Sequence, residues 1–242
     1  MKNNKMARKI ICCQICNSKK IRNIMFFGFI PPVNNMDSIG LINSENFNFP
    51  LNLVKCDSCH HVQIDTIVEK KVLFPFTYPY LSGTTKILKE NFLDLYNECN
   101  QMLSLKKDDL VLDIGSNDGT LLDSFKKNGL FTLGVEPSQA GQIANENGIE
   151  TIIDYFNEET VKKILINHKR PRVITATNVF AHIEEPNSLI KLIKKIMDKN
   201  SVFVTESHYL ISLIKTLQYD TIYHEHLRYY HLSALDKLFR LN

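Results

Sequence analysis

The chain has 242 residues, of which 44% are hydrophobic and 23% charged, and its formal net charge is only +3. This length fits one large domain or a main domain with a small attachment, and the composition predicts a packed core. The charge is spread along the sequence and does not suggest a nucleic-acid partner. No apolar run approaches the ~20 residues of a membrane span, and the first apolar run is too short for a signal peptide. We therefore expect a cytoplasmic protein with reduced cysteines.

Residues 1–80 contain two C-x-x-C pairs, "CQIC" and "CDSC". Two such turns can place four thiolates around one zinc ion in the tetrahedral geometry of a structural site. The alternatives are unrelated free cysteines or a thioredoxin-type redox pair, but neither pair opens a helix of a βαβ unit. Cys12 is an alternative to its neighbour in the first pair. The predicted zinc ligands are Cys13, Cys16, Cys56 and Cys59.

The prolines and weak helical periodicity of residues 1–80 predict a small loop-rich unit that is held by metal rather than by a hydrophobic core. From Thr85 onward the pattern changes, and apolar residues at helical spacing predict an amphipathic helix over residues 85–105. Short apolar runs then alternate with helical patterns, which is typical of a doubly wound α/β sheet and predicts a second domain over residues 81–242. The expected strands are 110–114, 131–136, 151–153, 172–177 and 201–206, and the expected helices are 120–128, 138–147, 158–167 and 186–198.

The stretch "LVLDIGSNDGTLLDSF" reads as a strand, a tight polar loop and the start of a helix. Its G-x-x-x-G spacing differs from the dinucleotide and phosphate-loop fingerprints, and no phosphate-binding lysine follows. Asp113 lies at the carboxyl end of the first strand, and Glu136 ends the second strand, where a carboxylate can accept ribose hydroxyls. These features favour S-adenosylmethionine over NAD or ATP, and an ordinary βα turn is the alternative.

The stretch "YDTIYHEHLRYYH", residues 219–231, crowds histidines, tyrosines and carboxylates into a segment without apolar periodicity. It could be a catalytic site, a metal site or a polar surface loop. If the chain were extended, His224 and His226 would share one face, which would allow a metal pair. Ser233 is a plausible cap of the helix that follows.

In chain order, "CQIC", "FPLNLVKCDSCHHVQID", "YPYLSGTT", "LDIGSNDGTLL", "GVEPS", "NVFAHIEEP" and "YDTIYHEHLRYYHLSAL" resemble the sugar C-methyltransferases of deoxysugar biosynthesis. The resemblance covers nearly the whole chain. It implies S-adenosylmethionine-dependent methylation of carbon 3 of a nucleotide-linked 4-keto deoxysugar. The implied fold is a small zinc unit, a class I methyltransferase domain with a Rossmann-like doubly wound sheet, and a further C-terminal α/β domain.

The resemblance also assigns site residues. The residues that match the family's adenosylmethionine site are Asp113, Gly115, Ser116, Asn117, Gly119 and Glu136. The active-site residues of the family match Tyr223, Glu225, His226 and His182, and the tyrosines that face the sugar match Tyr78 and Tyr80.

Methylation of carbon requires removal of the proton next to the ketone, and imidazole has a suitable pKa for a general base. Following the resemblance, we expect His226 to be the base. Tyr223, His182 or an ordered lysine or water would stabilise the enolate oxygen, and Glu225 would orient the base or bind a sugar hydroxyl. The alternative for His182 is a structural hydrogen bond, and the alternative for the two tyrosines is packing.

Members of this family continue beyond the position of Asn242. We therefore expect a fragment, one half of a split gene or a reduced enzyme, and a separately encoded C-terminal domain is a candidate partner besides the nucleotide sugar. Two rival functions stay open. One is a vestigial zinc- and adenosylmethionine-binding module without activity, and the other is a methyltransferase for another small-molecule acceptor.

Overall fold

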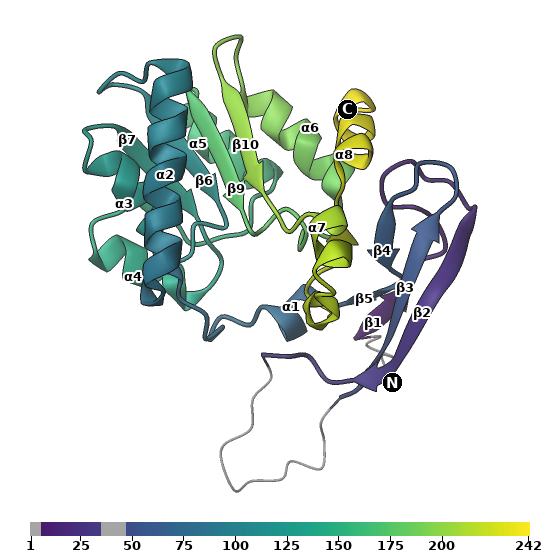
Figure 1. The fold of residues 1–242 in the computed structure, drawn as a ribbon. Helices are drawn as coiled ribbons and strands as arrows, with labels where there is room; N and C mark the ends of the chain where they lie inside the picture. Colours follow the sequence, from purple (N-terminus) through teal and green to yellow (C-terminus); the bar gives the residue numbers. More distant parts are fainter. Residues whose placement is uncertain (1–5, 35–46) are drawn as a thin grey trace, which may run out of the picture. The chain divides into compact units, whose positions relative to one another are not determined.

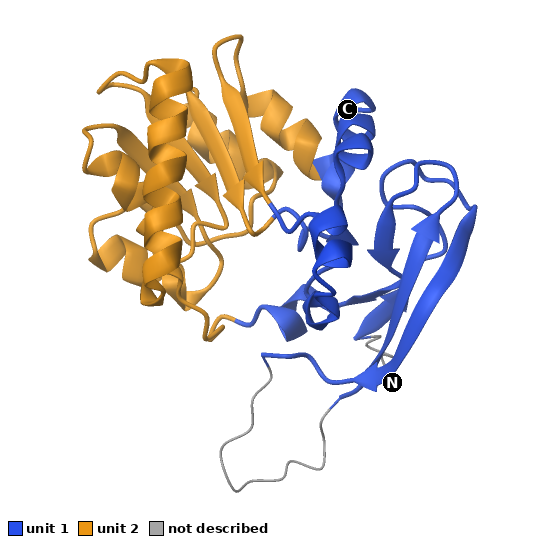
Figure 2. Ribbon diagram, in the orientation of Figure 1, with its two compact units in different colours: residues 1–75, 180–188, 207–242 blue, residues 76–179, 189–206 orange. Residues whose placement is uncertain are grey.

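The computed structural model describes residues 6–34 and 47–242. Figure 1 shows its helices and strands, and Figure 2 the two compact units into which the chain divides. Unit 1 consists of Met1–Pro75, Phe180–Ser188 and Ser207–Asn242, and unit 2 consists of Phe76–Val179 and Leu189–Glu206.

Unit 2 is built on a parallel sheet with the strand order β10-β9-β6-β7-β8. Its strands are β6 (Leu110–Ile114), β7 (Phe131–Val135), β8 (Thr151–Ile152), β9 (Val173–Thr177) and β10 (Val202–Glu206). Every residue of β6 and β9 is buried, as expected for strands that are covered on both faces. The strand order reverses between β6 and β9, and open α/β sheets bind ligands beyond the carboxyl ends of strands at such a point.

Helices cover both faces of this sheet (Figure 1). They are α2 (Lys86–Leu103), α3 (Thr120–Lys126), α4 (Gln139–Glu146), α5 (Glu158–Asn167) and α6 (Pro186–Ile196). Right-handed crossovers from β6 to β7 and β8 place α3 and α4 on one face, and the return to β9 and β10 places α5 and α6 on the other. Helix α2 joins the first face, where Phe92 and Cys99 share a core with Leu122 and Phe125 of α3.

Unit 1 combines the N-terminal segment with two later segments of the chain. Its larger sheet has the strand order β11-β4-β3-β2 and is antiparallel. These strands are β2 (Ile21–Ile30), β3 (Phe49–Cys56), β4 (Val62–Ile64) and β11 (Arg228–Tyr229), and a separate pair joins β1 (Ala7–Lys9) to β5 (Thr66–Val68). The helices of unit 1 are α1 (Lys70–Leu73), α7 (Leu210–Lys215), α8 (Leu232–Arg240) and the 3-10 turn η2 (Tyr219–Thr221), whereas η1 (Ser82–Thr84) belongs to unit 2.

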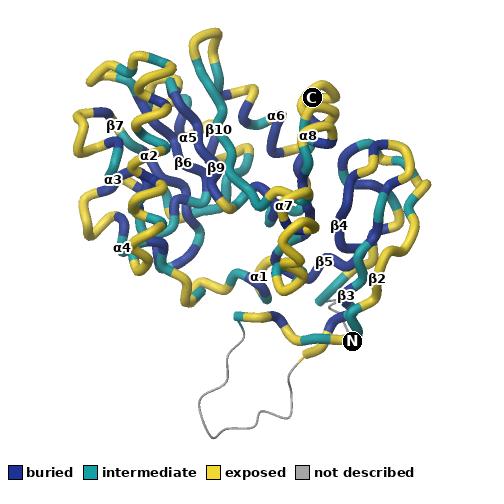
Figure 3. The backbone as a smooth tube through the Cα atoms, in the orientation of Figure 1, coloured by how far each residue is buried: buried dark blue, intermediate teal, exposed yellow. Residues whose placement is uncertain are grey.

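The expectation that the N-terminal unit lacks a hydrophobic core is wrong. Leu51 and Ile64 of the N-terminal sheet are buried together with Leu227 and Tyr229, which come from the C-terminal part of the chain. Buried stretches of β3 and β4 are coloured dark blue in Figure 3. Composition could not reveal this core, because its apolar residues are supplied by segments more than 160 positions apart in the sequence.

The predicted alternation of strands and helices in the doubly wound sheet is confirmed, with element ends that differ by one or two residues. The two compact units differ from the predicted consecutive domains 1–80 and 81–242, because residues 180–188 and 207–242 pack with the N-terminal segment. The proposed cap of the last helix is wrong: α8 is preceded by the extended residue His231, and Ser233 lies in its first turn. Within residues 6–34 and 47–242, no helix is long and apolar enough to cross a membrane.

Candidate active site and metal centre

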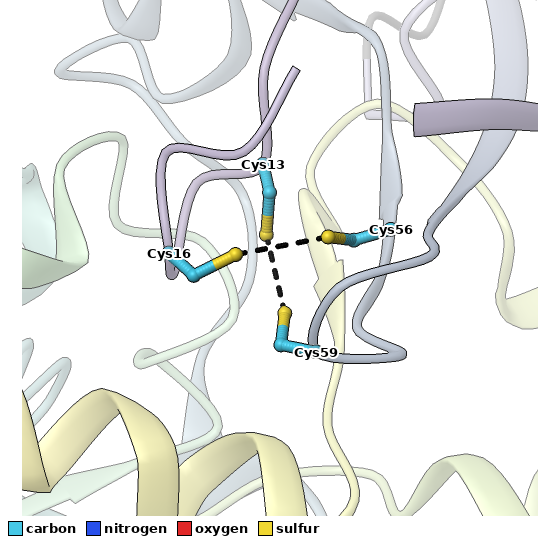
Figure 4. A group of neighbouring side chains, drawn as sticks. All are labelled: Cys13, Cys16, Cys56 and Cys59. Atoms are coloured by element: carbon cyan, nitrogen blue, oxygen red, sulfur yellow. Dashed lines mark hydrogen bonds between the residues drawn. The ribbon is translucent and has the colours of Figure 1, made fainter. Parts of the chain in front are cut away.

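The four predicted zinc ligands come together in unit 1 (Figure 4). The Sγ atoms of Cys13 and Cys59 are 3.5 Å apart, those of Cys16 and Cys56 are 3.7 Å apart, and all four lie within 4.8 Å of one another. A tetrahedral zinc ion with Zn–S bonds of ~2.3 Å separates its sulfur ligands by about 3.8 Å, so the cluster fits this metal. Four thiolates leave no position for water, which makes the site structural. Cys12 is outside the cluster, as expected.

The two cysteine turns have the same local geometry. The N–H of Asn17 donates to the carbonyl of Cys13, and the N–H of His60 donates to the carbonyl of Cys56, each at 2.9 Å. Asn17 and His60 both have a positive φ, of 56° and 62°. In each turn the sulfur of the first cysteine also accepts a backbone N–H two residues further on. These local bonds direct both pairs of thiols toward one point.

The glycine loop of unit 2 follows β6. Gly115 and Gly119 have φ values of +72° and +78°. A Cβ atom at Gly115 would collide with Val179, and one at Gly119 would be in tight contact with Ile149. Asp113 in β6 is buried, and its Oδ1 accepts a hydrogen bond of 2.6 Å from the hydroxyl of Thr175. Burial raises the pKa of Asp113 to about 7, with a further contribution from Glu136, although the Thr175 hydrogen bond acts in the opposite direction.

Glu136 and Asn117 fix the shape of this loop. Glu136 accepts the backbone N–H of Asn117 at 3.1 Å and that of Ser138 at 2.8 Å, one on each carboxylate oxygen. The side chain of Asn117 turns away from the loop: its Oδ1 accepts the N–H of Ser82, and its Nδ2 donates to the carbonyl of Tyr80. The Asn117 amide therefore holds the preceding segment rather than presenting a free polar group.

The two predicted sugar-facing tyrosines lie in unit 2, on the segment that precedes α2. The main chain of Tyr80 is held by Asn117, whereas its side chain is exposed. Tyr78 is half-buried. The N–H of Gly83 donates to Asp118 at 2.7 Å, so this segment contacts the glycine loop at several points. Ser116, the remaining predicted cofactor residue, is buried, and its hydroxyl has no hydrogen-bond partner among the described residues.

Unit 1 contains a histidine cluster around the predicted base. Nδ1 of His226 lies 2.8 Å from the carbonyl oxygen of Thr221, and Nε2 lies 3.0 Å from the hydroxyl of Tyr223. Because a carbonyl can only accept, Nδ1 carries the proton, and Nε2 accepts from Tyr223. Burial lowers the pKa of His226 to about 4, with a contribution from His208, while the Thr221 hydrogen bond opposes this shift. The imidazole is therefore neutral at physiological pH.

Two more histidines surround this ring. The ring centroids of His182 and His208 lie 5.0 Å and 4.4 Å from that of His226. His182 also stacks on Phe74 at 5.5 Å, and burial, followed by the neighbouring histidines, lowers its pKa to about 3. The sequence analysis did not identify His208. Its position could have indicated it, because it follows the end of the fifth strand by two residues and such sheets carry functional groups beyond the carboxyl ends of their strands.

Glu225 and His224 have other contacts than those expected. Glu225 is buried and accepts a hydrogen bond of 2.7 Å from Asn34, whereas the ring nitrogens of His226 bond to Thr221 and Tyr223. A role for Glu225 in orienting His226 thus has no support in these hydrogen bonds. Residues 223–225 form a bend and a turn and residues 226 and 227 are irregular, so the shared-face argument for a metal pair that includes His224, which assumed an extended chain, does not hold. Instead, His224 Nε2 lies 3.3 Å from the carbonyl oxygen of Pro50.

Comparison with known protein families identifies the chain. A family model described as "Methyltransferase domain" matches residues 87–242, and a second model, "Putative zinc binding domain", matches residues 13–74. The chain belongs to the methyltransferase domain family. The predicted class I methyltransferase fold is confirmed. The two family models and the cysteine cluster confirm the predicted cofactors, S-adenosylmethionine and Zn²⁺.

The chain resembles two further proteins, over different lengths. It is 31% identical over 240 residues to the C-methyltransferase NovU of Streptomyces niveus, covering 97% of this chain and 56% of that protein. A ubiquinone biosynthesis O-methyltransferase of Pasteurella multocida is 30% identical over 105 residues, which cover 38% of this chain and 43% of that protein. The chain thus spans about half the length of the curated relatives it matches.

The fold also matches solved methyltransferase structures. The plantazolicin methyltransferase BpumL, solved in complex with SAH, matches with a TM-score of 0.50 and 19% identity, over 62% of this chain and 61% of that one. This similarity concerns the fold alone.

Proposed function

We propose that the methyltransferase transfers a methyl group from S-adenosylmethionine to carbon 3 of a nucleotide-linked 4-keto deoxysugar. The similarity to a C-methyltransferase over 97% of the chain supports a carbon acceptor. The motif resemblance to the sugar C-methyltransferases supports the substrate class. The observation that carries the proposal is the hydrogen-bonded pair of Tyr223 and His226, because a buried neutral base with an adjacent hydroxyl donor suits enolate chemistry.

The cofactor site of the proposal is the glycine loop. The positive φ of Gly115 and Gly119 lets the backbone come close to a ligand, and Glu136 retains lone pairs that could accept ribose hydroxyls. S-adenosylmethionine would supply an electrophilic methyl group. Asp113, whose buried carboxyl would readily exchange a proton near neutral pH, and Ser116 complete the proposed contacts. Tyr78 and Tyr80 are proposed substrate contacts.

In the proposed mechanism His226 is the general base, and Tyr223 stabilises the enolate oxygen. In the described state the Tyr223 hydroxyl donates to Nε2 of His226, so the base is occupied. A ketone oxygen at carbon 4 would attract the same hydroxyl, which would free the Nε2 lone pair to accept the proton from carbon 3. Tyr223 would then stabilise the enolate oxygen, and the Thr221 carbonyl would stabilise the protonated imidazole through Nδ1. His182 packs against His226 and would limit the access of water to the base.

This mechanism is tested with a panel of 4-keto nucleotide deoxysugars in deuterated water, with product mass as the readout. The wild-type chain should exchange the carbon 3 proton and add one methyl group. Because general base catalysis contributes at least about a hundredfold, His226→Gln should reduce both reactions by that factor or more. His231→Gln, a histidine in the same stretch outside the cluster, is the matched control.

Calorimetric titration with S-adenosylmethionine accompanies these assays. If the wild-type and His226→Gln chains bind the cofactor with equal affinity, the loss of activity lies in the chemical step and not in cofactor binding. Exchange that persists in His226→Gln would identify another base. Cofactor binding without methyl transfer to any acceptor would favour the vestigial module, and methylation of a different acceptor would favour the other rival function.

A further inference from the structure

Gln14 follows the first cysteine of the zinc cluster, and its polar groups contact four other residues of unit 1. Its backbone N–H donates to Gln63 at 2.8 Å, and its carbonyl accepts from Asn187 at 2.9 Å. Its side-chain Nε2 donates to the carbonyl of Glu184 at 3.3 Å, and Oε1 accepts from Nη1 of Arg228 at 2.9 Å. Nothing in a zinc turn requires the second residue to make these side-chain contacts, so they call for another explanation.

The side chain of Gln14 joins the two segments that carry the histidine cluster. Glu184 lies two residues after His182, and Arg228 lies two residues after His226. The carbonyl of Arg228 is in turn the hydrogen-bond partner of His208 Nε2, at 3.2 Å. Through these hydrogen bonds, the Gln14 amide is connected to the segments that carry His182 and His226 and, through Arg228, to His208.

Arg228 is completely buried, and its hydrogen-bond partners are uncharged. Nε donates to the hydroxyl of Tyr230 at 3.0 Å, and Nη1 donates to Gln14 and to the carbonyl of Glu184. Among the described residues, Nη2 has no hydrogen-bond partner. A buried cation requires compensation. A zinc ion with four thiolates would carry a net charge of −2. Gln14, which accepts from Arg228, stands between Cys13 and Cys16 in the sequence, so the metal centre is the candidate source of that compensation.

We propose that Gln14 and Arg228 are positioning residues that fix the histidine cluster relative to the zinc-bound turn. Zinc bound to Cys13 and Cys16 would hold the turn in one conformation and thereby orient the Gln14 amide. This amide bonds to the carbonyl of Glu184, two residues after His182, and to the guanidinium of Arg228. The catalytic part of this inference rests on the proposed function, whereas the positioning can be measured without it.

The test replaces Gln14 by methionine, which has a similar volume but forms neither hydrogen bond. Asp57→Met is the matched control, because Asp57 has the same place in the second cysteine turn and forms a salt bridge with Arg22 at the surface. Both variants are measured for zinc content, for adenosylmethionine affinity, for kcat and KM, and for the histidine ring signals in long-range ¹H–¹⁵N spectra of the full chain.

Gln14→Met should retain zinc and cofactor affinity. It should lower kcat by about tenfold, as is typical when a residue that orients ligands or catalytic groups is replaced. It should also shift the ring signals of His182 and His208. Asp57→Met should change none of these. Gln14→Glu provides a second variant if Gln14→Met fails to fold. It can still accept from Arg228 but cannot donate to the Glu184 carbonyl, so the His182 signal should shift more than the His208 signal.

The inference is overturned if Gln14→Met leaves kcat and the ring signals unchanged, or if Asp57→Met produces the same changes. If the wild-type chain transfers no methyl group, the proposed function fails, but the ring signals of the variants still decide whether Gln14 positions the histidines.

Discussion

At the residue scale, burial rather than a charged partner determines the protonation of the histidine cluster. Desolvation is the largest cause of the lowered pKa of His182, His208 and His226, and in each case a buried imidazole avoids the cost of a buried positive charge. Asp113 shows the same effect with the opposite sign, because burial raises the pKa of a carboxyl group. The residue types were evident from the sequence, but their burial was not.

These shifts predict how stability depends on pH. The folded pKa of His182 is about 3 and that of His226 about 4, whereas the ordinary value is 6.5. Below pH 6.5 the unfolded chain binds protons that the folded chain does not, so stability is lost as pH falls toward the folded pKa values. As the pH falls from 6 to 5, each of these two histidines should lower the free energy of unfolding by about 1 kcal/mol.

The measurement is the free energy of unfolding in urea at both pH values, with zinc content determined in parallel. His182→Phe retains an aromatic ring beside Phe74 and removes one titrating group, so its stability should fall less steeply with pH. Equal pH dependence of wild type and variant would contradict a buried neutral His182.

At the element scale, the segment 80–84 and the glycine loop form one hydrogen-bonded arrangement. Asn117 bonds to Tyr80 and Ser82, and Asp118 bonds to Gly83. The motif "LDIGSNDGTLL" correctly predicted a strand, a loop and a helix, because buried apolar runs and glycines act locally. It did not predict the partner of Asn117, because that contact joins positions 35 or more residues apart.

Asn117→Gly should release this segment without backbone strain, because Asn117 has a φ of 50° and glycine adopts positive φ readily. The variant loses two hydrogen bonds, each of which is worth about 1 kcal/mol, so we expect adenosylmethionine affinity to fall by about tenfold. Hydrogen exchange of residues 80–84 should become faster. Asn128→Gly, which removes an exposed amide bonded within its own helical region, is the control. Unchanged exchange in Asn117→Gly would contradict the role of this side chain.

At the scale of the whole molecule, the metal centre and the proposed catalytic histidines belong to one compact unit, and the glycine loop belongs to the other. The histidine-bearing segments 180–188 and 207–242 are separated in sequence from the cysteines, but they share the core and the sheet of unit 1. Metal binding is therefore expected to affect the histidine cluster more than the glycine loop.

Removal of zinc with a chelator should destabilise unit 1 selectively. A structural zinc site contributes roughly 10 kcal/mol to folding, which is comparable to the whole stability of a small domain. We expect loss of protection from hydrogen exchange in unit 1, whereas unit 2 should still bind S-adenosylmethionine. Cys59→Ala should reproduce this effect, and Cys12→Ala should not, because Cys12 lies outside the cluster. Protection of unit 1 that persists without zinc would show that its hydrophobic core is sufficient.

The sequence by itself determined the parallel α/β sheet, the four-cysteine cluster and the types of residue available for chemistry. These features depend on short-range patterns: apolar periodicity, glycine at tight turns and two-residue cysteine spacing. Only the tertiary structure decided that β11 completes the N-terminal sheet, that His208 joins His182 and His226, and that Gln14 bonds to Arg228. The physical reason is that these contacts join distant segments through burial and single hydrogen bonds, which leave no periodic signal in the sequence.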